Sequence, residues 1–418
     1  MNFAPAPPNT FMQFMREYHT RCKTRIPEIR AVAAKWAFED LIPGLSDFDT
    51  RFIVDDAMTI DRWQAMSIAV GEVHTDMCRE FPEWARNLEH LPGVNLTVSE
   101  LVDPRIFYPE FQQWTFYEGE AAVIAHVEKR LAEMRWSARD ELHHLKKFAI
   151  YFGPYVRGID PPVNLGEWES KYPLHSRYMH YFAPPVQAAV SLVLKQNVRG
   201  KFDSLRMARS MFPMPETIDR LFDAVERHYE IPEDYVDPQQ AELERELERY
   251  LQSVWTALAS HVTLVKPVAG DTVEQVRGKV AAVKSDPVQS FFESAKFGRL
   301  LEGRLRFYAE FIPHFDSAWL IRNEVGRIGA NFYARPLTIF GRVKFGESLS
   351  PEGVLERLEG DMLSRDECKG MQRFAKLAAE SIPESRERAR SREVADMYHI
   401  VPIVTARLSE ELVAHAGA

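Results

Sequence analysis

The spacing of the hydrophobic residues changes along this chain, and that change constrains the fold more than any other feature. Strand-like alternation is concentrated in the first 118 or so residues, whereas most of the rest has apolar residues at helical spacing. Residues 49–54 alternate and end at a turn, residues 60–88 have helical spacing, and residues 94–99 alternate again. This order of strand, helix and strand predicts a mixed sheet, so we expect an α+β protein.

The remainder of the chain is expected to be mostly helical. Residues 119–262 show almost no strand-like alternation and predict a helical bundle. The breaker-rich segment 266–271 is a candidate linker. The remaining predicted elements are helices over 10–38, 272–310 and 351–380, and a stretch of strand character over 331–345.

Charge and composition exclude several classes of protein. With 52 basic and 61 acidic residues in 418, the net charge is −9, so no overall positive field attracts nucleic acid or an anionic membrane. No apolar run reaches the length of about 18 residues that a membrane span needs, and the N-terminal segment lacks a secretory pattern. Cys22, Cys78 and Cys368 fit neither a disulfide framework nor a zinc site. We therefore expect a cytoplasmic protein without nucleic-acid or membrane partners.

A pair of carboxylates at the start of the first predicted strand carries the most chemistry. Asp47 and Asp49 are two residues apart, so in a strand both side chains project from one face. Two such carboxylates can hold Mg²⁺, which binds few protein oxygens and leaves room for substrate phosphates. A solvated strand end would have the same pattern, so the pair alone does not decide between the two interpretations.

Five segments give the pair a context. The motif G-x-S-D-x-D before an apolar strand resembles the polymerase-β-type nucleotidyltransferase superfamily, and the later segments are most similar to the aminoglycoside (streptomycin/spectinomycin) adenylyltransferases. The segments lie, in the order of that family, at residues 43–54, 93–102, 107–119, 151–155 and 197–213. The resemblance covers roughly residues 30–235, and the last 150 or so residues have no counterpart in it.

The resemblance implies a domain organisation and a reaction. It implies a nucleotidyltransferase-like mixed-sheet domain over 1–118, a helical bundle domain over 119–265 and an α-rich C-terminal domain of unknown role over 271–418. Asp47 and Asp49 match the family's metal-binding carboxylates, and Lys201 falls close to a lysine that faces the nucleotide phosphates. The implied function is Mg²⁺-dependent transfer of a nucleotidyl group, with ATP as co-substrate, to a hydroxyl of a small molecule.

The sequence departs from the family at two positions of the expected site. The family's Gly-Ser turn has no equivalent, since the aligned region reads Lys35-Trp-Ala-Phe-Glu39, and Gly44 and Ser46 are the candidates for a substitute turn and hydroxyl. The family's third carboxylate, its general base, aligns with Asn95, and an amide cannot take up the proton. Glu100 is the nearest acid and thus the candidate base, although in a regular strand it would point to the opposite face.

These departures leave other functions open. A catalytically weakened relative that binds a nucleotide or metabolite is the main alternative, and an interaction protein with the N-terminal domain as scaffold is a third. Trp114 and Trp168 are candidates for the border of an acceptor site. His143 and His144 are neighbours on one helix, so their side chains diverge by about 100° and a shared metal is not expected.

Overall fold

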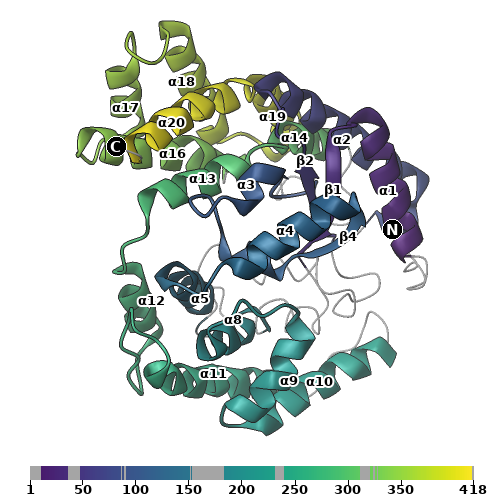
Figure 1. Cartoon of the computed structure of the whole chain (residues 1–418), viewed down its shortest axis with the longest axis vertical. Coiled ribbons are helices and arrows are strands. Elements are labelled where there is room, and N and C mark those ends of the chain that lie inside the picture. The colour runs from purple at the N-terminus through teal and green to yellow at the C-terminus, as the bar shows by residue number, and fades with distance from the viewer. Residues whose placement is uncertain are drawn as a thin grey trace.

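The protein is a mixed α+β molecule in which helices dominate (Figure 1). The computed structural model describes residues 11–35, 48–85, 87–88, 91–150, 152, 183–230, 240–310, 321–322, 325–326 and 328–416. All three cysteines lie in this part of the chain, buried and unpaired. Among the described helices, none combines the length and the apolar character that crossing a bilayer requires.

Four strands form one sheet in the order β3-β2-β1-β4. The central strand, β1 (Ile29–Ala34), is antiparallel to both β2 (Thr50–Val54) and β4 (Thr115–Gly119), and β2 is parallel to the two-residue β3 (Leu96–Thr97). The expected strand at 49–54 is therefore present.

The expected helix over 10–38 is wrong in its second half. Helix α1 ends at Arg25 (Phe11–Arg25), and β1 follows. Pro27 disfavours a helical conformation at Ile26 and so helps to end the helix. The small apolar side chains of β1 are buried on both faces of the sheet, which selects a central strand despite the high helix propensity of alanine.

Each face of the sheet is covered by helices. On one face, α1 and α2 (Ile60–Glu80) pack on Val32, Phe52 and Val54, and the short helix η3 (Pro82–Trp84) follows. The other face, with Ala31, Ala33 and Ile53, packs against a second group of elements. These are α3 (Val98–Val102), η4 (Pro109–Gln113) and α4 (Ala121–Glu133).

The helical bundle has a core of its own and lies below the sheet in Figure 1. Its elements are α5 (Ala138–Ile150), α8 (Ala183–Leu194), α9 (Lys201–Met211), α10 (Pro215–Glu230), α11 (Gln240–Ala257), η6 (Leu258–Ser260) and α12 (Val273–Ala281). The candidate linker 266–271 belongs to this bundle, because Asp271 is buried there. It accepts a hydrogen bond from Trp255 (2.8 Å) and forms an ion pair with Lys279 (2.6 Å). The chain leaves the bundle only at residues 282–286.

The C-terminal helices do not form a separate core. They pack with α1 and α2 into the largest cluster of buried side chains, so residues 287–416 and the N-terminal part of the chain are one structural unit. The elements are α13 (Pro287–Phe297), α14 (Leu301–Glu310), the π-helix η7 (Gly329–Ala334), α16 (Arg335–Phe345), α17 (Pro351–Leu358), α18 (Arg365–Ala379), η8 (Glu384–Arg386), α19 (Glu387–Met397) and α20 (Ile400–Ala416). The cores therefore group the chain differently from the three expected domains.

The strand character expected over 331–345 is wrong, since these residues are helical in η7 and α16. The buried residues of α16 are Pro336, Leu337, Phe340 and Gly341, which follow the spacing of one helix face. Gly346 ends the helix in the left-handed conformation, at φ 69°. Burial of that face against α13 and α17 outweighs the β-propensity of the sequence.

Helices α2 and α14 approach so closely that their contact depends on glycine. A Cβ atom at Gly303 would lie 1.9 Å from the carbonyl oxygen of Ser67. We expect Gly303→Ala to destabilise the protein by about 2–4 kcal/mol, because the two helices would have to move apart. Urea unfolding measures the change. Gly278→Ala is the matched control, since a Cβ at Gly278 meets nothing within 4 Å, and it should stabilise α12 by about 0.5–1 kcal/mol. Equal stability of Gly303→Ala and the parent would contradict the close contact.

Candidate functional site

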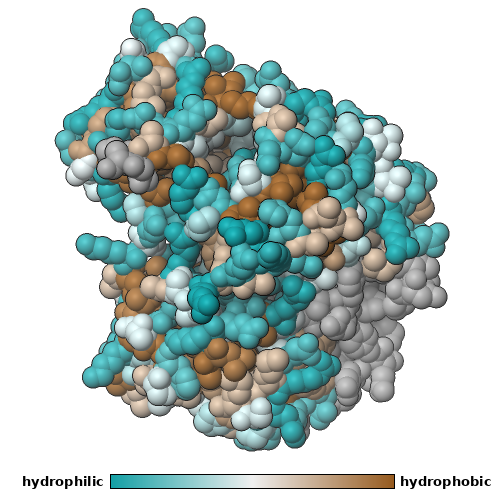
Figure 2. Space-filling model, in the orientation of Figure 1, coloured by the Kyte–Doolittle hydropathy of each residue, from teal (hydrophilic) through white to brown (hydrophobic). Residues whose placement is uncertain are grey.

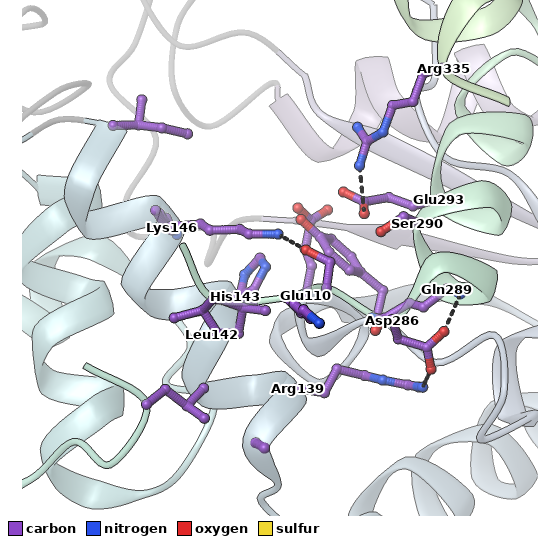
Figure 3. Close-up of a pocket in the computed structure, with 18 of the residues that line it drawn as sticks. Glu110, Arg139, Leu142, His143, Lys146, Asp286, Gln289, Ser290, Glu293 and Arg335 are labelled. Atoms are coloured by element: carbon purple, nitrogen blue, oxygen red, sulfur yellow. Dashed lines mark hydrogen bonds and ion pairs between the residues drawn. The ribbon is translucent and has the colours of Figure 1, made fainter. Parts of the chain in front are cut away.

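A pocket lies where the sheet, the bundle and the C-terminal helices meet. Its volume is about 630 Å³, and Figure 3 shows side chains from α5 on one side and from α13 and α16 on the other. Figure 2 shows an indentation between the C-terminal helices and α12 at the left edge of the molecule. Lys35 follows directly after β1, and Tyr108 and Glu110 belong to the segment around η4. Segments far apart in the sequence therefore build this site together.

The sequence-predicted residues are only partly within the described part of the chain. Asp47, Ser46, Gly44 and Trp168 lie outside it. Asp49 directly precedes β2, and its Oδ1 atom is 3.4 Å from the Nη1 atom of Arg51.

Glu110 is a buried carboxylate held by two cations. Its Oε2 atom is 3.2 Å from the Nζ atom of Lys35, and its Oε1 atom is 3.4 Å from the Nη2 atom of Arg51. Trp114 donates a hydrogen bond to it (3.3 Å). Burial alone raises the pKa of Glu110, but Lys35 and Arg51 outweigh burial and lower it to about 2. Lys35, whose pKa is raised mainly by the charge of Glu110, is therefore ionised.

Lys147 is a pocket lysine without a carboxylate partner in the described ranges. Its Nζ atom donates a hydrogen bond to the side-chain oxygen of Gln187 (2.8 Å). Burial and then the charge of Lys35 lower its pKa to about 7, and Lys201 contributes to the same lowering. Lys201, the first residue of α9, is thus close enough to Lys147 for their charges to interact.

Two more side chains of α5 face the same pocket. The ring of His143 packs edge-on against Tyr108, with centroids 4.7 Å apart, and burial holds the pKa of His143 well below its usual range. His143 is therefore neutral at pH 7 and can accept a hydrogen bond. Lys146 donates a hydrogen bond to the hydroxyl of Ser285, in the segment that leads into α13.

The opposite wall comes from the C-terminal helices. Asp286 caps the N-terminus of α13 and is 3.3 Å from the guanidinium of Arg139. Glu293 points into the pocket from α13, and its closest charged partner is Arg335 of α16 at 3.8 Å (Figure 3). No signal in the sequence placed these residues near the sheet, which ends at Gly119.

The electrostatic balance of the pocket is opposite to that of the whole protein. The lining residues include three carboxylates, those of Glu110, Asp286 and Glu293. They also include six cationic side chains, which are Lys35, Arg139, Lys146, Lys147, Lys284 and Arg335. In a chain with a net charge of −9, this local surplus of positive charge favours an anionic ligand.

The two residues expected at the third-carboxylate position have structural roles instead. Asn95 is fully buried, accepts a hydrogen bond from the backbone N–H of Phe52 (2.9 Å) and donates to the carbonyls of Pro92 and Gly93 (both 3.0 Å). All of these partners are backbone groups of β2 and the loop before β3. Asn95 therefore ties this loop to the sheet.

Glu100 lies in a helix, not on a strand as expected. Thr97 and Glu100 form a capping box that ends β3 and begins α3. The carboxylate of Glu100 contacts Arg299 (2.5 Å) and Lys296 (2.7 Å), which hold its pKa well below its usual range although burial alone raises it. A carboxylate bound by two cations is a poor proton acceptor, so this geometry does not support Glu100 as a base.

The described residues are a poor fit to a magnesium ion. No group of three or more histidine, cysteine, aspartate or glutamate side chains comes together in the part of the chain that the structure describes. Asp49 has Arg51 beside it, and the nearby Glu110 is held by Lys35 and Arg51. Cations already neutralise the carboxylates here, so we derive no step through a metal.

Trp114 does not line this pocket but a second one, of about 460 Å³, together with Trp136 and Asn197. The Trp114 side chain is fully buried and donates its indole N–H to Glu110, and the guanidinium of Arg51 lies 5.9 Å from its ring. Glu110 itself lies in the segment 107–119 that carries part of the resemblance, and an acid within an aromatic run is the signal that could have identified it. Lys35 and Lys147 had no such signal, because their importance depends on contacts between distant segments.

Comparisons with family models, with curated proteins and with solved structures find no match to this chain.

Proposed function

We propose that this pocket binds the phosphate groups of a nucleotide, with ATP as the leading candidate, and that the chain is a nucleotide-binding protein with weakened or no transfer activity. The observation that carries the proposal is that six lysine and arginine side chains, against three carboxylates, line one pocket of an acidic protein. Phosphate oxygens are the acceptors that lysine and arginine bind most strongly in such sites.

Lys147 is central to this proposal. Its amine is partly neutral at pH 7 in the ligand-free protein, because burial and neighbouring cations disfavour its charge. A bound phosphate would supply the missing negative charge, so the lysine would become fully protonated and form a charge-assisted hydrogen bond. Lys35 would assist from the end of β1, next to Glu110.

Adenylyl transfer from ATP to a hydroxyl of a small molecule is the second candidate. The position of Asp49 at the start of β2, close to Lys35 and Glu110, favours it. The structural role of Asn95 and the ion pairs of Glu100 argue against an efficient base. Under this candidate Asp47 and Asp49 would hold Mg²⁺ only after Arg51 had moved away from Asp49.

Calorimetric titration tests the proposal. We expect ATP and inorganic tripolyphosphate to bind in the absence of Mg²⁺, adenosine to bind far more weakly, and all phosphate binding to weaken as salt rises. Absence of measurable binding by both ATP and tripolyphosphate would contradict the proposal. Release of pyrophosphate from ATP with Mg²⁺ and a panel of polyols would favour the second candidate, and Asp49→Asn should then abolish that release.

A further inference from the structure

The wall of the pocket formed by the C-terminal helices carries polar groups that lack hydrogen-bond partners. In the described ranges, no hydrogen bond is formed by the carboxylate of Glu293, the hydroxyl of Ser290 or the hydroxyl of Tyr108, and all three residues line the pocket. The negative charge of Glu293 acts on the phenol of Tyr108, so these two groups are close together. Polar groups in a cavity without protein partners are available to a ligand.

Glu293 has only a weak partner among the residues that the structure describes. Its ion pair with Arg335 is long, at 3.8 Å, and has no hydrogen bond. Burial raises the pKa of Glu293 even though Arg335 and Lys146 oppose the rise. A ligand group that donates hydrogen bonds would satisfy this carboxylate.

The neighbours of Glu293 restrict the kind of donor. Arg335 and Lys146 flank it, so an ammonium group would be repelled by two cations, whereas a neutral hydroxyl would not. The hydroxyls of Ser290 and Tyr108 can each donate and accept, as sugar hydroxyls do. A carboxylate that accepts hydrogen bonds from ribose hydroxyls is also a general device of nucleotide recognition.

We infer that Glu293, Ser290 and Tyr108 form a subsite for the hydroxyl groups of a sugar, so that the ligand of this pocket is a phosphorylated sugar such as a nucleotide, not a plain polyphosphate. This inference rests on the proposed phosphate binding at Lys35 and Lys147. It gives the C-terminal helices a role, because α13 supplies two of the three residues and α16 supplies Arg335 behind them.

The experiment compares ATP, 2′-deoxyATP, 3′-deoxyATP and inorganic tripolyphosphate by calorimetric titration. The variants are Glu293→Gln, Ser290→Ala and Glu356→Gln. Glu356 is an exposed residue of α17, so its variant removes the same charge away from the pocket. A thermal melt of each variant establishes that it is folded.

Glu293→Gln is expected to change the affinities for ATP and for tripolyphosphate in different directions. Loss of a negative charge alone should tighten the binding of any anion, so Glu293→Gln should leave tripolyphosphate binding unchanged or tighter. We expect the same variant to weaken ATP binding by about five- to tenfold, because a charge-assisted hydrogen bond is lost. Ser290→Ala should weaken ATP binding about two- to fivefold. Glu356→Gln should change neither ligand.

The deoxynucleotides add a second readout. The parent should bind at least one of them more weakly than ATP, and Glu293→Gln should reduce that difference, as expected for two groups that contact each other. Tighter binding of ATP and tripolyphosphate alike by Glu293→Gln would overturn the sugar subsite while leaving phosphate binding intact. A parent that binds neither compound would overturn the proposed function, and the subsite with it.

Discussion

Replacing Lys147 by methionine is expected to remove most of the affinity for ATP while making the ligand-free protein more stable. Affinity should fall by about 10- to 100-fold, since the side chain offers a charge-assisted hydrogen bond to phosphate in a partly desolvated pocket. Stability should rise by about 1–3 kcal/mol at pH 7, because the variant no longer buries an ammonium group that the surrounding cations disfavour.

The pH dependence of this effect has a defined sign. The pKa of Lys147 is lowered from its usual 10.5 to about 7, so between these values the unfolded chain binds the proton more tightly than the folded one. The destabilisation by Lys147 is therefore complete below pH 7 and disappears as the pH rises toward 10.5. The stability gained by Lys147→Met should disappear over the same range.

Ligand binding should show the complementary trend. A bound phosphate raises the pKa of Lys147, so binding takes up a proton and ATP affinity falls as the pH rises above 7, and this fall should be weaker in Lys147→Met. Lys35, Glu110, Lys201, His143 and His144 also act on this site, so the difference between the two proteins is the informative quantity. Urea unfolding and calorimetric titration across this range provide the measurements.

Lys284→Met is the matched control for this experiment. Lys284 lines the pocket but is exposed, so its loss removes the same formal charge from water instead of from a buried site. We expect a change in ATP affinity below about threefold and no change in stability beyond about 0.5 kcal/mol. Equal ATP affinity in Lys147→Met and the parent would mean that the phosphates do not reach α5.

Asn95→Asp should destabilise the protein by about 3–5 kcal/mol at pH 7. The carboxylate would face the carbonyls of Pro92 and Gly93 at the distance where the amide now donates two hydrogen bonds, and it would be fully buried. The resembled family has a catalytic acid at the aligned position, so the sequence alone suggests that this change creates a base. Because the side chain at this position forms hydrogen bonds with backbone groups of β2 and the loop before β3, we expect no gain in pyrophosphate release.

The pH dependence of stability distinguishes the effect of the buried charge in Asn95→Asp from the effect of the lost hydrogen bonds. Burial raises the pKa of the introduced carboxyl above that of the unfolded chain, so its penalty is complete above the folded pKa and lessens as the pH falls. Asn95→Ala, which loses the hydrogen bonds without adding a charge, should be destabilised at all pH values alike. Urea unfolding at neutral and acidic pH distinguishes them. If Asn95→Asp were stable and released pyrophosphate faster than the parent, position 95 would belong to the active site, which would contradict this prediction.

The sequence predicted elements whose pattern is local and failed where distant packing decides. The strand at 50–54 is marked by alternation and a following turn, both of which are properties of adjacent residues. The strand at 29–34 is rich in alanine, and only the strands on either side of it make it part of a sheet. The helix α16 has strand-like composition, and only its packing against neighbouring helices selects its conformation.

The residues of the candidate site also differ in whether a local sequence pattern or the packing of distant segments reveals them. Asp49 was predicted because it belongs to a short motif, and Lys201 because it falls close to a lysine of the resembled family, but neither lines the pocket. Glu110, Lys35 and Lys147 meet only after the sheet and the bundle have come together. Glu293 and Arg335 lie in the part of the chain that has no counterpart in the resembled family, and their role depends on where α13 and α16 pack.

The packing of α14 on α2 has a consequence for the synthesis of this protein. Gly303 donates its backbone N–H to the hydroxyl of Ser67, a residue 236 positions earlier. While the chain is being translated, the part of α2 that packs on α14 therefore lacks this partner until the helical bundle and α13 have been synthesised. A nascent chain that ends before Gly303 leaves that part of α2 exposed, and exposed apolar surface favours aggregation before folding is complete.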